Sequence, residues 1–89
     1  MAAIQRLGDQ NDAGAPITAV GQNFVFCNGR PVSVVGDPVQ GHGSGRHSSP
    51  VTDGGSRFNY IAGRRVVLTG NLDTCDHSRV GGSPNVFSD

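Results

Sequence analysis

The chain has 89 residues, which is enough for one small domain and leaves no room for a second core. Its charge comes from seven arginines and seven aspartates, so the net charge is zero, and this balance argues against nucleic acid as a partner, because phosphate contacts need clustered positive charge. Fourteen glycines and five prolines, set against three leucines and one methionine, exclude a helical bundle and favour short strands joined by tight turns.

The N-terminal segment Met1–Gln10 contains no apolar stretch of signal-peptide length, and the apolar run Phe24–Cys27 is far too short to cross a bilayer. We therefore expect synthesis in a bacterial cytoplasm, where Cys27 and Cys75 would be free thiols or thiolate ligands. A Cys27–Cys75 disulfide would need an oxidising space. A chain this short buries little apolar surface, so a metal ion or a partner subunit is expected to add stability.

An internal repeat organises much of the chain. Three glycines recur at a spacing of 34 residues, as Gly21, Gly29 and Gly36 and then as Gly55, Gly63 and Gly70. The two complete units span about residues 17–37 and 51–71. A shared offset at three positions predicts that both units fold into the same local structure.

A third unit is predicted to be split between the two ends of the chain. Residues 7–9 resemble residues 35–37, and residues 81–87 resemble the stretch 54–56. The termini should then meet to complete an approximate threefold symmetry, within a single domain that covers residues 1–89.

Each complete unit contains a predicted β-hairpin. In the first, the β-prone segment Phe24–Cys27 precedes Asn28-Gly29, which is typical of a type I′ turn because both residue types tolerate positive φ. In the second, strands at 58–61 and 65–69 flank Ala62-Gly63, a weaker turn because alanine tolerates positive φ poorly. A Gly-Asp or Gly-Asn pair after each return strand predicts a further turn. The predicted fold class is all-β, with short hairpins and no substantial helix.

Two loops carry the residue types that bind transition metals. His42 and His47 lie five apart in the Gly-Ser-rich loop 40–50, and Cys75 and His77 lie two apart after the second hairpin. Three imidazoles and one thiolate would form the closed tetrahedral shell that Zn²⁺ favours in structural sites. The alternative is that surface histidines and a spare cysteine happen to lie in loops, and the spacing alone does not distinguish the two.

Other polar residues have less specific roles. Asp12, Asp73 and Asp76 are either substitute ligands, acceptors for imidazole N–H groups, or, as we expect, solvated turn residues. Cys27 aligns with Ile61 of the second unit, which predicts a small buried apolar residue rather than a ligand. The stretch Gly41–Arg46 lacks the glycines of a nucleotide-binding loop or a nucleophile elbow, so we assign no catalytic residue and expect no enzyme.

Taken together, the sequence resembles PAAR-repeat proteins, the small tip proteins on the central spikes of type VI secretion systems and contractile phage tails. The residues that carry the resemblance are Leu7-Gly8-Asp9, 28–32, 35–37 and 82–87. The eponymous Pro-Ala-Ala-Arg is Pro31-Val32-Ser33-Val34 here. The resemblance implies a small cone of short strands, with pseudo-threefold symmetry at a broad base and zinc bound near the apex by three histidines and one cysteine.

The resemblance also implies ligand positions. Family members often carry a first ligand five residues after the glycine of the opening Gly-Asp. This count from Gly70 reaches Cys75, and the count from Gly36 ends one residue before His42. The family site therefore carries over to Cys75 and His42, with His47 and His77 as the remaining imidazoles. Asp12 is the reserve fourth ligand.

The function implied is mechanical. One copy is expected to cap and sharpen a trimeric β-helical spike, with Val86 and Phe87 among the apolar residues facing it. A structural metal, Zn²⁺ by default with iron as the other option, would make the apex rigid for membrane puncture. The protein would be assembled at the tip of a phage tail or secretion spike and delivered through the target envelope, with transient contact to the target membrane. The alternatives are a stand-alone metal-binding interaction module and a small metal-dependent hydrolase, whose metal would need an open coordination position.

Overall fold

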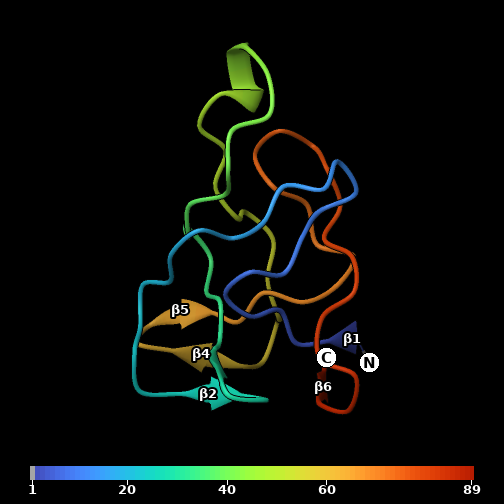
Figure 1. The fold of residues 1–89 in the computed structure, drawn as a ribbon. Helices are drawn as coiled ribbons and strands as arrows, with labels where there is room; N and C mark the ends of the chain where they lie inside the picture. Colours follow the sequence, from blue (N-terminus) through green and yellow to red (C-terminus); the bar gives the residue numbers. More distant parts are fainter. Residues whose placement is uncertain (1) are drawn as a thin grey trace.

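The computed structural model describes residues 2–89 as short strands, turns and loops. Three antiparallel strand pairs lie in the lower half of Figure 1. The pairs are β2 (Phe26–Cys27) with β3 (Arg30–Pro31), β4 (Tyr60–Ile61) with β5 (Arg64–Arg65), and β1 (Ala2–Ala3) with β6 (Phe87–Ser88). Within residues 2–89 the one helical element is a 3-10 turn, η1 (Gly45–His47), so the all-β prediction is confirmed. In the same residues no helix has the length and apolar character needed to span a bilayer.

The third strand pair joins the two ends of the chain. Ala2 lies opposite Ser88 and Ala3 opposite Phe87, and the termini are neighbours in Figure 1. This pairing has the same antiparallel form as the β2–β3 and β4–β5 hairpins. It is the contact that a unit divided between the termini requires.

Both hairpin turns have the left-handed conformation of a type I′ turn. Asn28 and Gly29 have φ of 55° and 79°, as the Asn-Gly pair predicts. Ala62 and Gly63 have φ of 54° and 79°, so the second turn has the same shape although the Cβ of Ala62 costs about 1–2 kcal/mol there.

The strands are shorter than predicted because the backbone after each hairpin pairs with a different unit. Gln5, Ser33 and Val67 form a closed ring of backbone hydrogen bonds around the pseudo-threefold axis. The Gln5 N–H donates to the Val67 carbonyl, Val67 to Ser33, and Ser33 to Gln5, each at 3.0 Å. All three residues are fully buried. We call this the axial ring.

The turns after the axial ring explain the recurrent Gly-Asp and Gly-Asn pairs. The side-chain oxygens of Asp9, Asp37 and Asn71 each accept a hydrogen bond from the backbone N–H three residues earlier, at 2.7, 2.8 and 2.8 Å. The preceding glycines have φ between 89° and 96°, a region that favours glycine. Each pair therefore builds one tight turn, and each turn leads into a loop at the upper end of the molecule (Figure 1).

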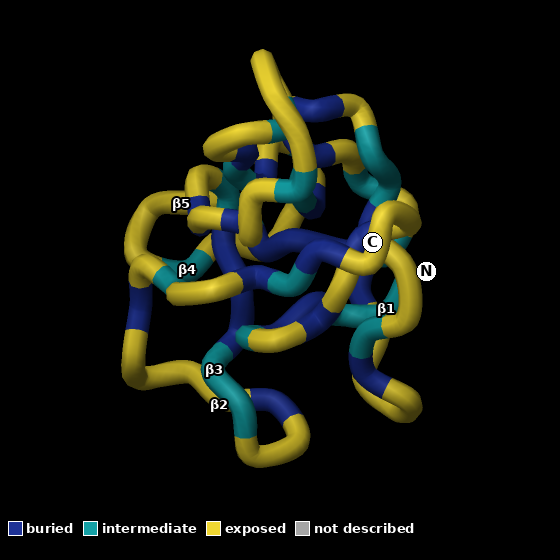
Figure 2. The backbone as a smooth tube through the Cα atoms, turned by 45° about the horizontal axis from the view of Figure 1, so that its top comes forward, coloured by how far each residue is buried: buried dark blue, intermediate teal, exposed yellow. Residues whose placement is uncertain are grey.

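The apolar core is divided between two small clusters along the axis. The lower cluster contains Cys27, Val32, Val66 and Leu68, and the upper cluster contains Ala15, Ile17 and Val39. Cys27 is thus a small buried apolar residue, as the alignment with Ile61 predicts, and both cysteines are free thiols. Figure 2 shows buried backbone in the middle of the molecule and exposed backbone in the outer loops.

Candidate metal centre

Three loops form the end of the molecule opposite the strand pairs (Figure 1). The bridges Gln10–Pro16, Pro38–Val51 and Leu72–Ser78 close them at their feet, which defines loops 10–16, 38–51 and 72–78. Loop 38–51 is the longest, carries η1 and projects furthest in Figure 1. The three loops are pseudo-threefold equivalents, but only the second and third carry histidine or cysteine.

The four residues singled out as ligands come together at this end. One ring nitrogen from each of His42, His47 and His77 and the Sγ of Cys75 all lie within 4.8 Å of one another. The three ring centroids are 4.9, 5.0 and 5.2 Å apart, and the Cys75 side chain is buried. We call these four residues the His-Cys cluster. Their coordination of a metal remains a prediction.

The shape of loop 38–51 turns its two histidines toward each other. The His42 N–H donates to the His47 carbonyl at 2.9 Å, and His42 Nε2 lies 3.0 Å from His47 Nδ1. Gly41 allows the two limbs of the loop to approach, because a Cβ at this position would lie 2.4 Å from the Ser48 carbonyl oxygen. The five-residue spacing of the histidines is therefore produced by a narrow loop and not by a helix face.

Loop 72–78 is a tight turn that places Cys75 and His77 near each other. The Asp73 N–H donates to the His77 carbonyl at 2.9 Å, and Asp76 has the left-handed φ of 66°. Asp76 is exposed and forms an ion pair with Arg46 of loop 38–51 at 2.8 Å. Because both side chains are well exposed, this pair adds little stability, about 0–1 kcal/mol at most.

The surroundings of the imidazoles suit metal binding. Burial lowers the pKa of His47, and the neighbouring His42, His77 and Arg46 lower it further. A lowered pKa keeps an imidazole neutral, which is the form that binds a metal. Three imidazoles beside a buried thiol are a donor set that fits Zn²⁺, so the cluster could hold a metal ion.

Beneath the cluster lies a buried polar group that the sequence analysis did not anticipate. Arg79 is fully buried, and its guanidinium lies 3.2 Å from Asp73 and donates to the carbonyls of Asp9 and Ala15 at 3.2 and 2.9 Å. Asn11 donates to the same carboxylate oxygen that Arg79 contacts, Asp73 Oδ2, at 3.0 Å. Burial raises the pKa of Asp73 and lowers that of Arg79.

The expectation of solvated turn aspartates is therefore correct for Asp76 and Asp12, which are both exposed, and wrong for Asp73. Asp73 is buried and ion-paired, because its loop folds back over the upper core. Asp12 is half-exposed, and its Oδ1 lies 2.5 Å from Nδ1 of His77. Asp12 lies outside the group of converging ligand atoms, so the structure places it behind a histidine and not among the candidate ligands.

Large apolar side chains gather at the opposite end of the molecule. All five aromatic residues of the chain are more than half exposed, namely Phe24, Phe26, Phe58, Tyr60 and Phe87. Phe26, Tyr60 and Phe87 begin β2, β4 and β6, so they occupy the same place in the three strand pairs. We call the five residues the aromatic base.

Buried polar side chains shape the loops that carry the aromatic base. Gln22 accepts hydrogen bonds from the N–H groups of Phe24 and Val25, at 3.0 and 2.8 Å. Ser56 Oγ accepts from residues 58 and 59, and Ser83 Oγ from residues 85 and 86, at 2.9–3.3 Å. The same pattern of side-chain hydrogen bonds therefore shapes the loop before each of β2, β4 and β6, although the residue is a glutamine in one loop and a serine in the other two.

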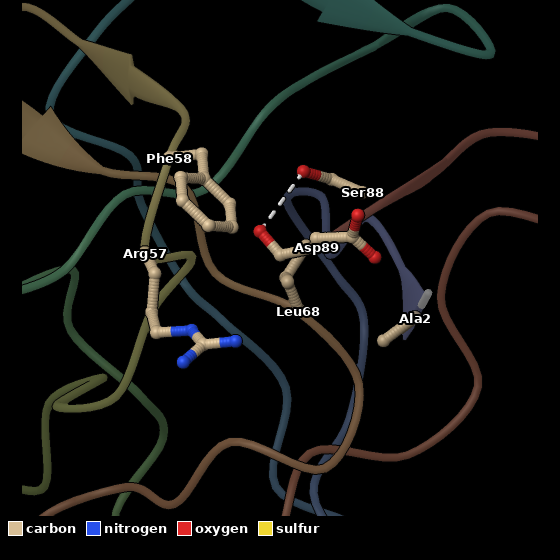
Figure 3. Close-up of a pocket in the computed structure, with 6 residues that line it drawn as sticks. All are labelled: Ala2, Arg57, Phe58, Leu68, Ser88 and Asp89. Carbon is tan, nitrogen blue, oxygen red and sulfur yellow. Dashed lines mark hydrogen bonds between the residues drawn. The ribbon is translucent and has the colours of Figure 1, made fainter.

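Two hollows open at this end. One, of about 520 Å³, lies beside the termini, lined by Ala2, Arg57, Phe58, Leu68, Ser88 and Asp89 (Figure 3). The other, of about 390 Å³, is lined mainly by apolar side chains from threefold-related positions, including Ile4, Val32 and Val66 and also Val25 and Val86. Neither hollow contains a residue of the His-Cys cluster.

A known protein family matches most of the chain. The family described as PAAR motif matches residues 7–75, a stretch that includes both complete repeat units and His42, His47 and Cys75. No curated protein matches the chain. Because the match covers well over half of the sequence and agrees with the all-β structure, the chain belongs to the PAAR motif family.

Proposed function

We propose that this protein is the tip of a membrane-piercing spike in a contractile injection machine, either a phage tail or a type VI secretion system. The observation that carries the proposal is the polarity of the molecule, with the His-Cys cluster at one end and the aromatic base at the other. Membership of the PAAR motif family supports it. The protein would travel on the spike through the target envelope and touch the target membrane only in passing.

The His-Cys cluster would make the tip rigid. His42, His47, Cys75 and His77 would hold one metal ion, and Zn²⁺ is the ion that this donor set favours. When bound, the ion supplies a cross-link between loops 38–51 and 72–78. Four protein ligands leave no position open for a substrate, so the proposed role is structural and not catalytic.

The aromatic base would dock onto the spike. Exposed aromatic side chains are enriched at protein interfaces and are unusual in such number on a small monomer. Because Phe26, Tyr60 and Phe87 are related by pseudo-threefold symmetry, the surface they form matches a partner with true threefold symmetry. The proposed partner is therefore a trimeric β-helical spike that binds one copy of this protein.

Mixing the protein with the spike of its own machine tests this proposal. Size-exclusion chromatography with light scattering should give a complex of one tip protein with three spike chains. Tyr60→Asp should weaken the complex by at least about tenfold, since it places a charge in the apolar contact. Thr18→Asp, an exposed change away from the base, is the control and should bind normally. A complex with three copies of each chain would contradict the proposal.

A further inference from the structure

Loop 10–16 stands where a third ligand-bearing loop would stand, yet it offers no ligand. Its backbone repeats the turn of loop 72–78: Asn11 N–H donates to the Ala15 carbonyl at 3.0 Å, as Asp73 N–H does to His77 at 2.9 Å. Ala13 and Ala15 therefore occupy the places of Cys75 and His77. Alanine cannot bind a metal, so this loop must take part in another way or not at all.

The loop instead brings a carboxylate to the back of a candidate ligand. Asp12 Oδ1 lies 2.5 Å from Nδ1 of His77, which is close for a hydrogen bond. The backbone fixes this approach, because the Asp12 N–H donates to the carbonyl of Ser78, next to His77, at 2.9 Å. The same backbone bond recurs around the axis, from Gln40 to Pro16 and from Thr74 to Val51, at 2.9 Å in both cases.

We propose that Asp12 is a positioning residue of the metal centre, which holds His77 so that Nε2 faces the metal. An ionised carboxylate only accepts hydrogen bonds, so the proton of a neutral His77 ring must sit on Nδ1. The lone pair that can bind a metal is then on Nε2 of His77. The hydrogen bond from Nδ1 to Asp12 fixes the orientation of the ring and so the direction of this lone pair. This inference rests on the proposed metal centre.

A second histidine is oriented by the equivalent position of its own loop. His42 Nδ1 lies 3.3 Å from the carbonyl oxygen of Gln40, and Gln40 corresponds to Asp12 in the threefold pattern. Hydrogen bonds from the far ring nitrogen to a carboxylate or carbonyl raise the basicity of a metal-bound imidazole and fix its tautomer. Loop 10–16 thus contributes to the proposed metal centre by orienting His77 through Asp12, although it supplies no ligand of its own.

Metal affinity is the first test. Zn²⁺ affinity would be measured by competition with a chromogenic chelator for the wild type, Asp12→Ala and Asp12→Asn. Asp12→Ala should bind about 10- to 100-fold more weakly, with one ion still bound at saturation. Asp12→Asn should lose less, because its amide oxygen can still accept the Nδ1 proton. Since Asp12 is half-exposed, both variants should fold.

A matched control separates the hydrogen bond from the charge. Asp76→Asn removes one negative charge from the ligand loop itself, but the partner of Asp76 is Arg46 and not an imidazole. Asparagine also tolerates the left-handed φ of this position. The affinity of this variant should stay within about threefold of the wild type. An equal loss in Asp76→Asn and Asp12→Ala would overturn the role of Asp12.

The second test identifies which ring nitrogen of His77 binds the metal. In protein loaded with ¹¹³Cd, nitrogen–cadmium couplings should identify Nε2 of His77 as the ligand atom, with a proton on Nδ1. Coordination through Nδ1, or Asp12 variants that bind Zn²⁺ as tightly as the wild type, would overturn this inference alone. A wild-type protein that binds no metal would overturn the metal centre and this inference together.

Discussion

Arg79 departs from the threefold pattern in the character of its side chain. The backbone N–H of Arg79 donates to Asn71, as that of Ile17 does to Asp9 and that of Thr52 to Asp37. The equivalent places therefore hold an apolar residue, a small polar residue and a fully buried arginine. The guanidinium ties loop 10–16 to loop 72–78 through Ala15 and Asp73. It fastens the loop that carries no metal ligand.

Removing this arginine should destabilise the fold strongly. Arg79→Met leaves the Asp73 carboxylate buried without its charged partner, with only the hydrogen bond from Asn11, which should lower the free energy of unfolding by about 3–5 kcal/mol. The double variant Arg79→Ile/Asp73→Val introduces the residues found at the equivalent positions 17 and 39 and should recover most of the loss. Urea unfolding of the metal-loaded proteins measures both. Additive losses in the double variant would show that the two side chains do not act as a pair.

At the scale of elements, the two hairpin turns have the same conformation, but only the first has residues that both favour positive φ. The first turn has asparagine at its left-handed first position and the second has alanine, Ala62, with φ of 54°. The pairing of Tyr60 with Arg65 and of Ile61 with Arg64 leaves two residues for the connection, which holds the second turn in this form.

Replacing Ala62 by asparagine should relieve this strain. Ala62→Asn is expected to raise the free energy of unfolding by about 0.5–1 kcal/mol and the melting temperature by about 3–6 °C. Differential scanning calorimetry would measure the change. Ala19→Asn is the control, since Ala19 is also exposed but does not have positive φ, and it should not stabilise the protein. No gain at position 62, or an equal gain at position 19, would contradict the explanation.

The features that the sequence predicts correctly depend on local chemistry. Asn28-Gly29 and the Gly-Asp pairs specify their turns through φ alone, and the glycine spacing reveals the repeat. Strand length could not be predicted, because residues after Pro31 and Arg65 pair with other units instead of extending their own hairpins. The roles of Asp12 and Arg79 also depend on contacts across more than 60 residues of sequence.

At the scale of the whole molecule, stability is distributed unevenly along the axis. The two apolar clusters and the axial ring support the lower and middle parts, whereas η1 contains no buried residue and the outer part of loop 38–51 is exposed. Above the bridge that closes this loop, its fixed shape depends on the hydrogen bonds of a narrow turn and on the His-Cys cluster. The proposed metal therefore lies where the chain itself supplies least packing.

Metal removal should lower stability markedly. Elemental analysis of purified protein should show about one Zn²⁺ per chain, and chelation should lower the melting temperature by at least about 10 °C. Cys75→Ser should lose the ion and melt like the chelated protein, because a serine hydroxyl is a poor Zn²⁺ ligand. Cys27→Ala is the matched control and should keep the ion, since Cys27 lies in the lower cluster. Full metal occupancy in Cys75→Ser would refute the thiolate as a ligand.

The axial ring has a mechanical consequence. A force pressed on the loop end along the axis tends to spread the three surrounding segments sideways. The ring resists this movement, because its hydrogen bonds run around the axis and each segment both donates to one neighbour and accepts from the other. No segment can move outward alone without stretching two bonds, so an off-centre impact is shared by all three. Resistance to splitting is thus built into the backbone and is independent of the side chains at the point.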